Sequence, residues 1–396
     1  MKNKKLWLIF PAAAVFALAL LLAVGLILRP LPPDGLAVDD LGVLYWEGDD
    51  RATSYTVDID GKIYTTDVWY MDIFDITDEY KTYTVTVTAK GFLGFKRAKT
   101  ISYDLPALPE DAFIFTLKPD ESGFNVALNP DVAVSGKVII PSSHDGKPVT
   151  GIASQGFESR QDLTSVFLPD SVTSISVSAF NGDKSLQRVR FSQSLTSIGN
   201  TAFRNCSALK EVTLPEGLLE IGGDAFRNCT SLTHVTIPDS TQVISPKAFG
   251  GCEISFIVSK DVRCLDDALK GTLYITYDYV TANVEPGIVR GSHILLASSF
   301  VGEGADKYLD SLVFTKRWDA EIYPQPPIAP YRKGYKFLGW STKREGDKVT
   351  YTMEDLMLSY DTDSWPTSPS YSLICAKVPY GTTLYPVWEK IKTYDK

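Results

Sequence analysis

The chain has 396 residues, enough for two or three domains at about 150 residues each, and 44% of them are hydrophobic. Its 39 basic and 48 acidic residues give a net charge of −9, and it contains only three His and five Cys. This composition excludes a disordered polymer and disfavours nucleic-acid binding, because contacts to phosphates need clustered Lys and Arg. The few His and Cys leave little material for a multi-ligand zinc site, and we expect no metal and no cofactor.

Residues 6–28 form an uncharged, apolar run that Lys2, Lys4 and Lys5 precede. As a helix, such a run would span about 35 Å, enough to cross a bilayer. We predict an uncleaved signal anchor with a Pro-rich linker over residues 1–33; a cleaved signal peptide is the alternative. Because the three Lys precede the run, the N-terminus belongs in the cytoplasm and the rest of the chain outside the cell.

Residues 34–106 alternate between apolar and polar residues and are rich in Thr, Val and Tyr, a pattern typical of half-buried strands. Asp60-Gly61 is a tight-hairpin signal between two such strands. The segments LYWEGDDRATSYTVDIDG and YTVTVTAKG resemble a fibronectin type III domain. The resemblance implies a small β-sandwich in which Trp46 and Tyr83 pack between the sheets, and the role of a spacer or an adhesion module.

A 23-residue period dominates the middle of the chain. Five apolar columns keep it: Phe157, Phe180, Phe203, Phe226 and Phe249; Ile152, Ile175, Ile198, Ile221 and Ile244; Leu163, Leu186, Leu209 and Leu232; Val166, Val189, Val212 and Val235; Leu168, Phe191, Leu214 and Ile237. A period of 20–29 residues with Leu-rich strands predicts a solenoid, in which neighbouring repeats stack and their strands pair in parallel.

The residue pattern within each repeat identifies the kind of repeat more specifically than its period does. SLTHVTIPDSTQVISPKAFGGC and ALKEVTLPEGLLEIGGDAFRNC resemble the BspA-like leucine-rich repeat of bacterial surface proteins, and GKVIIPSSHDGKPVTGIASQGF resembles an opening repeat. We place the solenoid at residues 107–262. A hairpin over residues 113–126 would form its N-terminal cap, because terminal repeats of solenoids are atypical.

Cys206, Cys229 and Cys252 keep the same period, and Asp183 occupies their column one repeat earlier. We expect free, buried thiols, since parallel Cβ directions on adjacent repeats disfavour a disulfide, although the expected Cα separation would permit one. For Asp183 we expect a partly exposed edge rather than a metal site. Asn205-Cys206-Ser207 and Asn228-Cys229-Thr230 match the glycosylation tripeptide, but both fall in the packed turn and we interpret them as coincidence.

The strand residues between the apolar columns point outward. We predict the partner-binding surface there, and expect Ile139 and Phe167 to expose a contiguous apolar area flanked by Arg residues, a combination common in binding hot spots. The alternative is a solvated face that a neighbouring domain partly covers. A single imidazole on this face is expected to be a surface residue rather than a ligand. The predicted binding residues are Lys137, Ile139, Phe167, Arg188, Arg190, Glu211 and His234.

Residues 263–396 lose the period and become rich in Tyr, Pro and Trp. The segments PPIAPYRKGYKFLGWSTKREGDKVTY and GTTLYPVWEK resemble the Listeria–Bacteroides repeat, which implies a small β-grasp-like module with Trp340 and Trp388 in its core and turns at Gly334 and Gly339. Residues 281–325 and 354–380 are longer than that family needs, and we assign them no role.

No pattern predicts catalysis. Gly302-Glu303-Gly304 lacks the third glycine of a dinucleotide loop, and Asp361-Thr362-Asp363 lacks the remaining ligands of a calcium loop. We therefore predict a mainly β, multidomain, membrane-anchored surface protein whose leucine-rich-repeat sheet binds a surface protein or polysaccharide. The alternatives are a structural spacer of the cell envelope without a soluble ligand and a carbohydrate-active enzyme, since two carboxylates can meet from distant segments.

Overall fold

The computed structural model describes residues 29–91, 94–258, 263–264, 271–276, 293–301, 308–313, 329–346, 348–356, 358–360, 373–375, 378 and 382–393. The chain divides into two compact units, which are residues 1–107 with 391–396 and residues 108–390. Residues 6–28, where the membrane anchor is predicted, lie outside the described residues. Within the described ranges, no helix has the length and apolar character needed to cross a bilayer.

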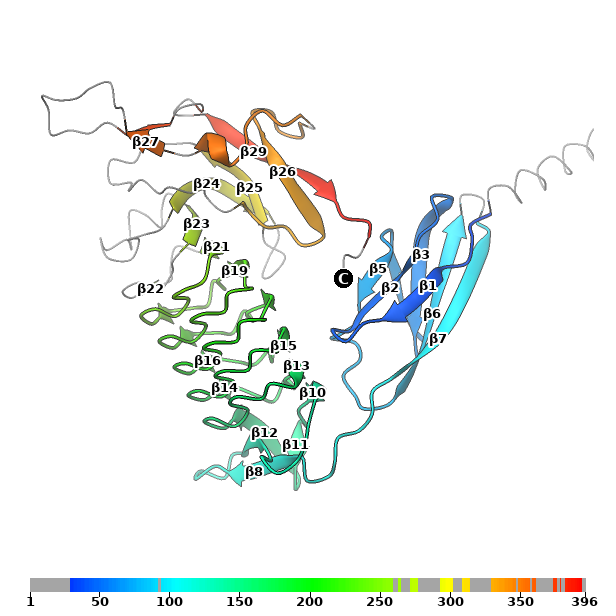
Figure 1. Ribbon diagram of the computed structural model, residues 1–396, viewed down its shortest axis with the longest axis vertical. Coiled ribbons are helices and arrows are strands. Elements are labelled where there is room, and N and C mark those ends of the chain that lie inside the picture. Colours follow the sequence, from blue (N-terminus) through cyan, green and yellow to red (C-terminus); the bar gives the residue numbers. More distant parts are fainter. Residues whose placement is uncertain are drawn as a thin grey trace, which may run out of the picture. The chain divides into compact units, whose positions relative to one another are not determined.

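The first unit consists of two antiparallel sheets (Figure 1). One sheet has the order β1-β2-β5, with β1 at Asp34–Val38, β2 at Val43–Glu47 and β5 at Tyr70–Asp72. The other has the order β4-β3-β6-β7, with β3 at Ala52–Ile59, β4 at Lys62–Thr66, β6 at Thr82–Gly91 and β7 at Lys96–Asp104. Burial alternates along β3 and β6, as the sequence pattern predicts.

The two aromatic residues singled out in the first unit are both buried. Trp46 on β2 is 4% exposed and Tyr83 on β6 is 3% exposed. The Trp46 ring lies 5.3 Å from that of Tyr55, and the Tyr83 hydroxyl donates to the Glu79 carbonyl at 3.1 Å. Asp60 and Gly61 join β3 and β4 with φ of 48° and 89°, which confirms the tight hairpin.

The second unit begins with the solenoid, whose repeats build two parallel sheets rather than one. The first sheet has the order β10-β13-β15-β17, at Gly136–Ile139, Leu163–Phe167, Arg188–Arg190 and Glu211–Val212. The second has the order β22-β20-β18-β16-β14-β12-β9-β8, at Arg263–Cys264, Val243–Ile244, Glu220–Ile221, Ser197–Ile198, Ser174–Ile175, Lys147–Ile152, Phe124–Leu128 and Phe113–Leu117, with β11 (Ser143–His144) paired to β12.

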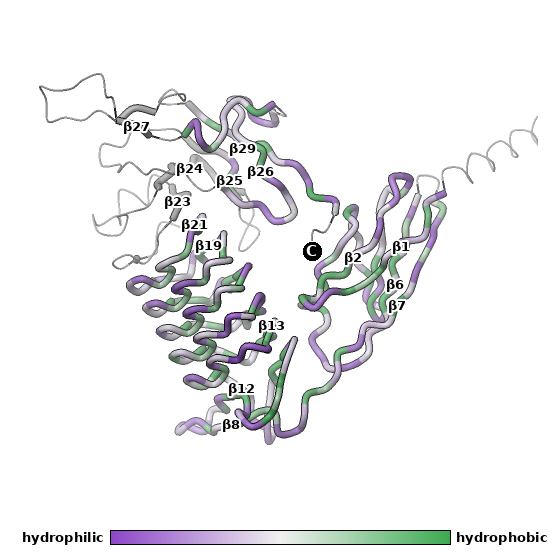
Figure 2. Tube along the Cα trace, viewed as in Figure 1, coloured by the Kyte–Doolittle hydropathy of each residue, from purple (hydrophilic) through white to green (hydrophobic). Residues whose placement is uncertain are grey.

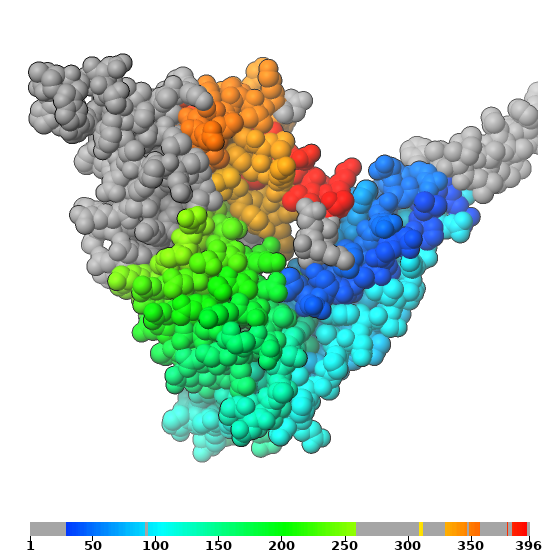
Figure 3. All heavy atoms as spheres, in the orientation of Figure 1, coloured from blue at the N-terminus to red at the C-terminus, as the bar shows by residue number. Residues whose placement is uncertain are grey.

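The register of both sheets confirms the 23-residue period. Val166 pairs with Val189, and Ile175 with Ile198, so that each repeat is one rung of the solenoid. In Figure 3 successive rungs, in green, follow one another as a continuous surface, and in Figure 2 hydrophilic residues recur at the turns between strands. The predicted cap is also present, because β8 and β9 form an antiparallel hairpin and β9 pairs in parallel with β12.

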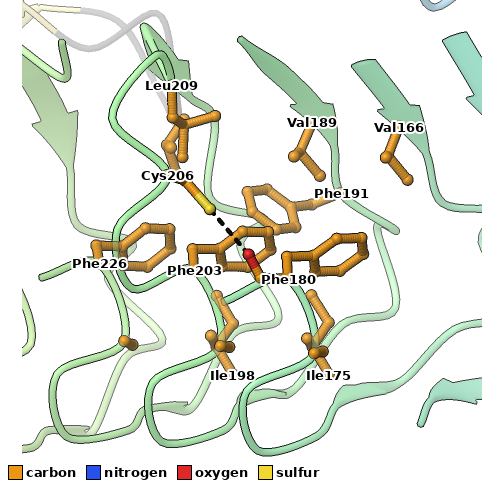
Figure 4. Packing of buried hydrophobic residues seen from close by; sticks show 14 of the residues in the cluster. Val166, Ile175, Phe180, Val189, Phe191, Ile198, Phe203, Cys206, Leu209 and Phe226 are labelled. Atoms are coloured by element: carbon orange, nitrogen blue, oxygen red, sulfur yellow. Dashed lines mark hydrogen bonds between the residues drawn. The ribbon is translucent and has the colours of Figure 1, made fainter. Parts of the chain in front are cut away.

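The Phe column forms the centre of the solenoid core, between the Val and Ile columns of the two sheets (Figure 4). All five rings are fully buried, and neighbouring centroids lie 4.9, 5.0, 5.2 and 5.0 Å apart. The backbone continues the stack, because the amides of the first four Phe residues donate to an Ala carbonyl of the next rung, as Phe203 does to Ala225 at 2.7 Å. Identical rung length therefore aligns side chains and backbone together.

Each rung also has two positions with a left-handed backbone, and both keep the 23-residue period. These turns let the chain reverse direction between the two sheets. The first column holds Gln155, Ser178, Thr201, Asp224 and Lys247, with φ of 54–59°; the second holds Ser159, Gly182, Asn205, Asn228 and Gly251, with φ of 62–82°.

The Cys column confirms the expectation of free, buried thiols: Cys206, Cys229 and Cys252 are buried and unbridged. The Cys206 thiol donates to the Phe180 carbonyl at 3.1 Å (Figure 4). The other two thiols make the same bond to Phe203 and Phe226, at 3.1 and 3.2 Å. Burial raises the pKa of Cys252 to about 11, so the thiols remain protonated donors at neutral pH.

The expectation for Asp183 is wrong: its side chain is fully buried rather than at an exposed edge. Its Oδ1 accepts a hydrogen bond of 2.6 Å from the Arg160 amide, whereas its Oδ2 is buried without a hydrogen-bond partner among the described residues. The physical reason is that the column position is interior in every rung, whichever residue occupies it. A polar residue at this position stays buried, because the neighbouring repeats fix the register of the rung.

Parallel pairing continues beyond the last regular repeat. The sheet β19-β21-β23-β24-β25-β29-β26 contains β19 at His234–Thr236, β21 at Ile254–Val258, β23 at Gly271–Thr276, β24 at His293–Val301, β25 at Tyr308–Val313, β29 at Thr383–Lys390 and β26 at Tyr335–Ser341. The first four strands are parallel and the later pairs antiparallel. An antiparallel pair of β27 (Leu358–Tyr360) and β28 (Leu373–Cys375) and a 3₁₀ turn at Glu354–Leu356 complete the described elements.

The predicted C-terminal aromatic core is present. Trp340 is fully buried, and the Phe337 ring lies 5.2 Å from it and 5.5 Å from Trp388. Gly339 has φ of 146°, and a Cβ there would lie 2.5 Å from the Val349 Cγ1 atom, so no other residue fits. Most of the segments 281–325 and 354–380 lies outside the described residues.

Candidate functional site

The first solenoid sheet places six of the seven predicted binding residues in two columns. Lys137, Arg188 and Glu211 share one column, in which Ser165 stands between the first two. Ile139, Phe167 and Arg190 share the other. His234 lies one rung further, on β19 of the seven-stranded sheet. The columns thus form as the period predicts.

The expected exposed apolar area does not form. Ile139 is 7% exposed and Phe167 only 6%. The Arg190 guanidinium lies 4.7 Å and the Lys137 Nζ 5.9 Å from the centroid of the Phe167 ring. Alternation along a strand predicts the direction of a side chain, but long cationic neighbours can fold their stems over it.

Arg190 is held in place over this ring. Its Nη1 donates to the Leu168 carbonyl at 2.7 Å and to the Asp170 carboxylate at 2.6 Å. Asp170 also accepts from the Gln193 amide at 3.0 Å. The hydrogen bond from Arg190 holds the pKa of Asp170 below its usual value, so this carboxylate stays ionised at neutral pH. The result is an ordered cation over an aromatic ring.

A cavity of about 430 Å³ lies at the end of this face, where the four-stranded sheet ends at β17 and the seven-stranded sheet begins at β19. Two of the predicted residues, Glu211 and His234, line it. Its lining consists of the two rungs and a short C-terminal segment: Lys210, Glu211, Val212, Thr213, Leu214, Ser231, Thr233, His234, Thr236, Tyr331 and Lys333. The repeat pattern carries no signal for Tyr331 and Lys333, because they come from outside the periodic region.

His234 is half-buried rather than a freely exposed surface residue. Its ring stacks on Tyr331, with centroids 4.3 Å apart and planes 20° from parallel. Nε2 lies 3.2 Å from the Thr236 hydroxyl, and Nδ1 lies 3.4 Å from that of Ser255. Burial lowers the pKa of His234 to about 4, so the imidazole is neutral at physiological pH. It therefore positions Tyr331 at the cavity without adding charge.

A second, more open hollow of about 550 Å³ runs along the turns of the second left-handed column. The Asn228 Nδ2 donates to the Asn205 Oδ1 at 2.9 Å, and Asn181 binds the Glu158 carboxylate at 2.7 Å. The amides of the two glycosylation tripeptides thus belong to a side-chain ladder between rungs, which agrees with the structural interpretation of these tripeptides.

The described residues hold no group of three or more His, Cys, Asp or Glu placed to bind a metal ion. Gly302-Glu303-Gly304 and Asp361-Thr362-Asp363 lie outside the described residues. The described face carries cationic groups, the carboxylates of Asp170 and Glu211, hydroxyl groups and aromatic rings.

Comparison with known proteins assigns the repeat. Residues 139–263 match the model of the BspA type leucine rich repeat region, in six copies. The curated proteins give no match. Among solved structures, a leucine-rich repeat protein of T. pallidum is 28% identical, with 42% of this chain and 84% of that chain covered and a TM-score of 0.36.

Two further solved structures are similar over about half of the chain. A leucine rich cell surface protein of Faecalibacterium prausnitzii is 23% identical, with 52% of this chain and 58% of that one covered and a TM-score of 0.34. The pneumococcal vaccine antigen PcpA is 20% identical, with 46% and 52% covered and a TM-score of 0.35. The repeats of residues 139–263 are thus similar to the BspA type leucine rich repeat region.

Proposed function

We propose that the protein is a bacterial cell-surface protein, anchored in the membrane by residues 6–28, whose leucine-rich-repeat sheet binds a protein or glycan partner. The observation that carries this proposal is the ordered pair of Arg190 and Phe167 at the centre of the outward face. A cation already fixed by Asp170 loses little side-chain entropy when a partner binds, and Arg over an aromatic ring is a common hot-spot element.

The location rests on the sequence. Lys2, Lys4 and Lys5 precede the apolar run, which orients the solenoid toward the outside of the cell. Sequencing the N-terminus of the exported product tests the anchor: we expect the full chain in the membrane fraction, whereas a new N-terminus after residue 28 would mean a secreted protein.

The binding face is tested with a double substitution on the first solenoid sheet and a control substitution on the second. Arg188 and Arg190 lie on β15 of the first sheet, whereas Glu220 is exposed on β18 of the second. Cells displaying the full chain are incubated with labelled surface proteins and polysaccharides. We expect saturable binding that the double variant Arg188→Ala with Arg190→Ala weakens at least about tenfold, a typical loss for hot-spot groups, while Glu220→Gln changes nothing.

The rival function is a spacer or scaffold of the cell envelope. It predicts no saturable binding to any probe and equal behaviour of both variants. Binding that Glu220→Gln abolishes would instead place the interaction on the second sheet.

A further inference from the structure

The cavity between β17 and β19 has features that the rest of the face lacks. Lys210, Glu211 and Lys333 are all exposed at its wall. Neither Lys forms an ion pair within the part of the chain that the structure describes. By contrast, Arg190 is already paired with Asp170. The cavity therefore offers two cations against one carboxylate, an excess of one positive charge.

The remaining lining is neutral and of two kinds. Hydroxyl groups of Thr213 and Thr233 stand on neighbouring rungs, and both residues are exposed. Val212 and Leu214 contribute apolar surface, and both are largely buried. A sugar ring needs this mixture, because its hydroxyl groups require hydrogen-bond partners while its C–H faces favour apolar contact.

The size of the cavity fits a single unit rather than a polymer. A volume of about 430 Å³ is near the lower limit of ligand pockets. Peptides usually bind along a sheet edge or in an extended groove, where their backbone finds partners over several residues. A compact, hydroxyl-lined cavity with surplus positive charge is better suited to one acidic sugar residue.

We propose that this cavity binds the carboxylated sugar residue of an acidic polysaccharide, with Lys210 and Lys333 neutralising its carboxylate. The inference rests on the proposed function and specifies its ligand. The stack of His234 on Tyr331 keeps the C-terminal wall of the cavity in place, and Glu211 makes the site selective by repelling ligands that carry charge in the wrong position.

The test uses the full chain in detergent micelles with glucuronate as the probe and glucose as its neutral counterpart, followed by saturation-transfer NMR and calorimetry. We expect a dissociation constant of about 1 mM for glucuronate, as for other single small ligands, and at least about tenfold weaker binding of glucose, which lacks the charge for the ion pairs. The double variant Lys210→Gln with Lys333→Gln should remove this difference. Lys184→Gln, an exposed Lys at the other hollow, is the matched control and should change nothing.

A variant that binds more tightly distinguishes a direct effect on the cavity from a folding defect. Glu211→Gln removes the like charge, and we expect it to strengthen glucuronate binding about threefold, within the range of exposed charge pairs. A misfolded variant would bind less, not more. Raising the salt concentration from 50 to 500 mM should weaken glucuronate binding in the wild type and leave the Lys double variant unchanged.

Three results would overturn the inference. If no binding is detected at a glucuronate concentration of 50 mM, the cavity is not a ligand site. If glucuronate binds the Lys double variant as tightly as the wild type, Lys210 and Lys333 do not contribute to binding. If acetate or a peptide rich in Glu binds as tightly as glucuronate, the cavity recognises the carboxylates of proteins rather than those of sugars. In each case, saturable binding of other partners that Arg188→Ala weakens would leave the proposed function standing.

Discussion

Asp183 and Cys206 occupy the same core position on consecutive rungs, 23 residues apart. Each lies next to the Phe column, but only the Cys206 side chain forms a hydrogen bond with a carbonyl of the preceding rung, because the Asp183 Oδ2 has no partner among the described residues. Burial raises the pKa of Asp183 to about 8, against the opposing effects of the Arg160 amide and guanidinium, while the nearby Glu158 raises it further. The first rung of the column therefore holds a carboxyl group where later rungs hold thiols.

Replacing this acid with the residue of the column should stabilise the solenoid. Asp183→Cys removes a buried oxygen without a partner and supplies a thiol for the equivalent carbonyl, that of Phe157. We expect the free energy of unfolding at pH 8 to rise by about 1–3 kcal/mol, the usual cost of an unsatisfied buried polar group. Urea unfolding under reducing conditions measures it, with Asp162→Cys at an exposed position as the control. A less stable Asp183→Cys variant would mean that the carboxylate makes an essential contact.

The Phe stack predicts a graded response to truncation. Phe203 has stacked neighbours at 5.0 and 5.2 Å on both sides, whereas Phe157 ends the stack with one neighbour at 4.9 Å. Both rings are fully buried. Phe203 also meets the Phe191 ring edge to face at 5.6 Å, so it has two aromatic pairs more than Phe157. We expect Phe203→Leu to cost about 1–3 kcal/mol more than Phe157→Leu, the contribution of these two pairs. Denaturant unfolding of the two variants, side by side, gives the difference. Equal losses would assign the stabilisation to apolar burial alone.

The register of the solenoid was predictable because the repeat is strict. Five columns that keep one spacing leave a single alignment of Val166 with Val189 and of Phe180 with Phe203. The buried thiols follow from the same periodicity. The second parallel sheet was not predicted, because its strands are only two residues long in most rungs and resemble turns.

The left-handed columns and the cavity were not predicted from the sequence, for two different reasons. Gly182, Asn205, Asn228 and Gly251 keep the period and are residue types that favour positive φ, so this column was available to sequence analysis. The cavity was not, because the stack of Tyr331 on His234 joins segments far apart in the chain. The placement of the Arg190 and Lys137 cations over the Phe167 ring depends on side-chain conformations that no strand pattern specifies.

Lys247 should tolerate replacement by a residue better suited to its backbone. It is exposed and has φ of 57°, a conformation that costs about 1 kcal/mol for most side chains. Asn adopts this left-handed backbone conformation more easily than Lys, and it loses less conformational entropy on folding than Gly would. We expect Lys247→Asn to raise the free energy of unfolding by about 0.5 kcal/mol. Lys184→Asn, at an exposed position without a positive φ, is the control and should not be stabilising.

Gly339 should be essential for the C-terminal core. Gly339→Ala places a methyl group 2.5 Å from Val349 Cγ1 and 2.8 Å from the Tyr351 carbonyl, at a φ of 146°. We expect a loss of at least about 2 kcal/mol, as for other overpacked core positions, and a red shift of the emission of the buried Trp340. At Gly223 the nearest atom to an added Cβ is 3.4 Å away, so Gly223→Ala should have little effect. A normal Trp340 environment in Gly339→Ala would refute the packing argument.

Asp183 and His234 predict opposite pH dependences of stability in the same unit. The pKa of Asp183 is about 8 in the folded protein against 3.8 for a free side chain, so the folded state holds the extra proton and stability falls as the pH rises between these values. The pKa of His234 is about 4 against 6.5, so the unfolded state binds the extra proton and stability falls as the pH decreases from 6.5 to 4. Each slope is at most about 1.4 kcal/mol per pH unit, and between pH 4 and 6.5 the two cancel.

Two single variants separate these contributions. Asp183→Asn keeps an acceptor for the Arg160 amide and removes the acid, so we expect its free energy of unfolding to rise with pH from 4 to 6.5 relative to the wild type. His234→Gln removes the base, and its stability should fall over the same interval. Above pH 6.5 the wild type should lose stability up to pH 8, whereas Asp183→Asn should not. Urea unfolding at half-unit steps of pH measures all three curves. Parallel curves for wild type and Asp183→Asn would show that Asp183 titrates normally and that water reaches its Oδ2 in the folded protein.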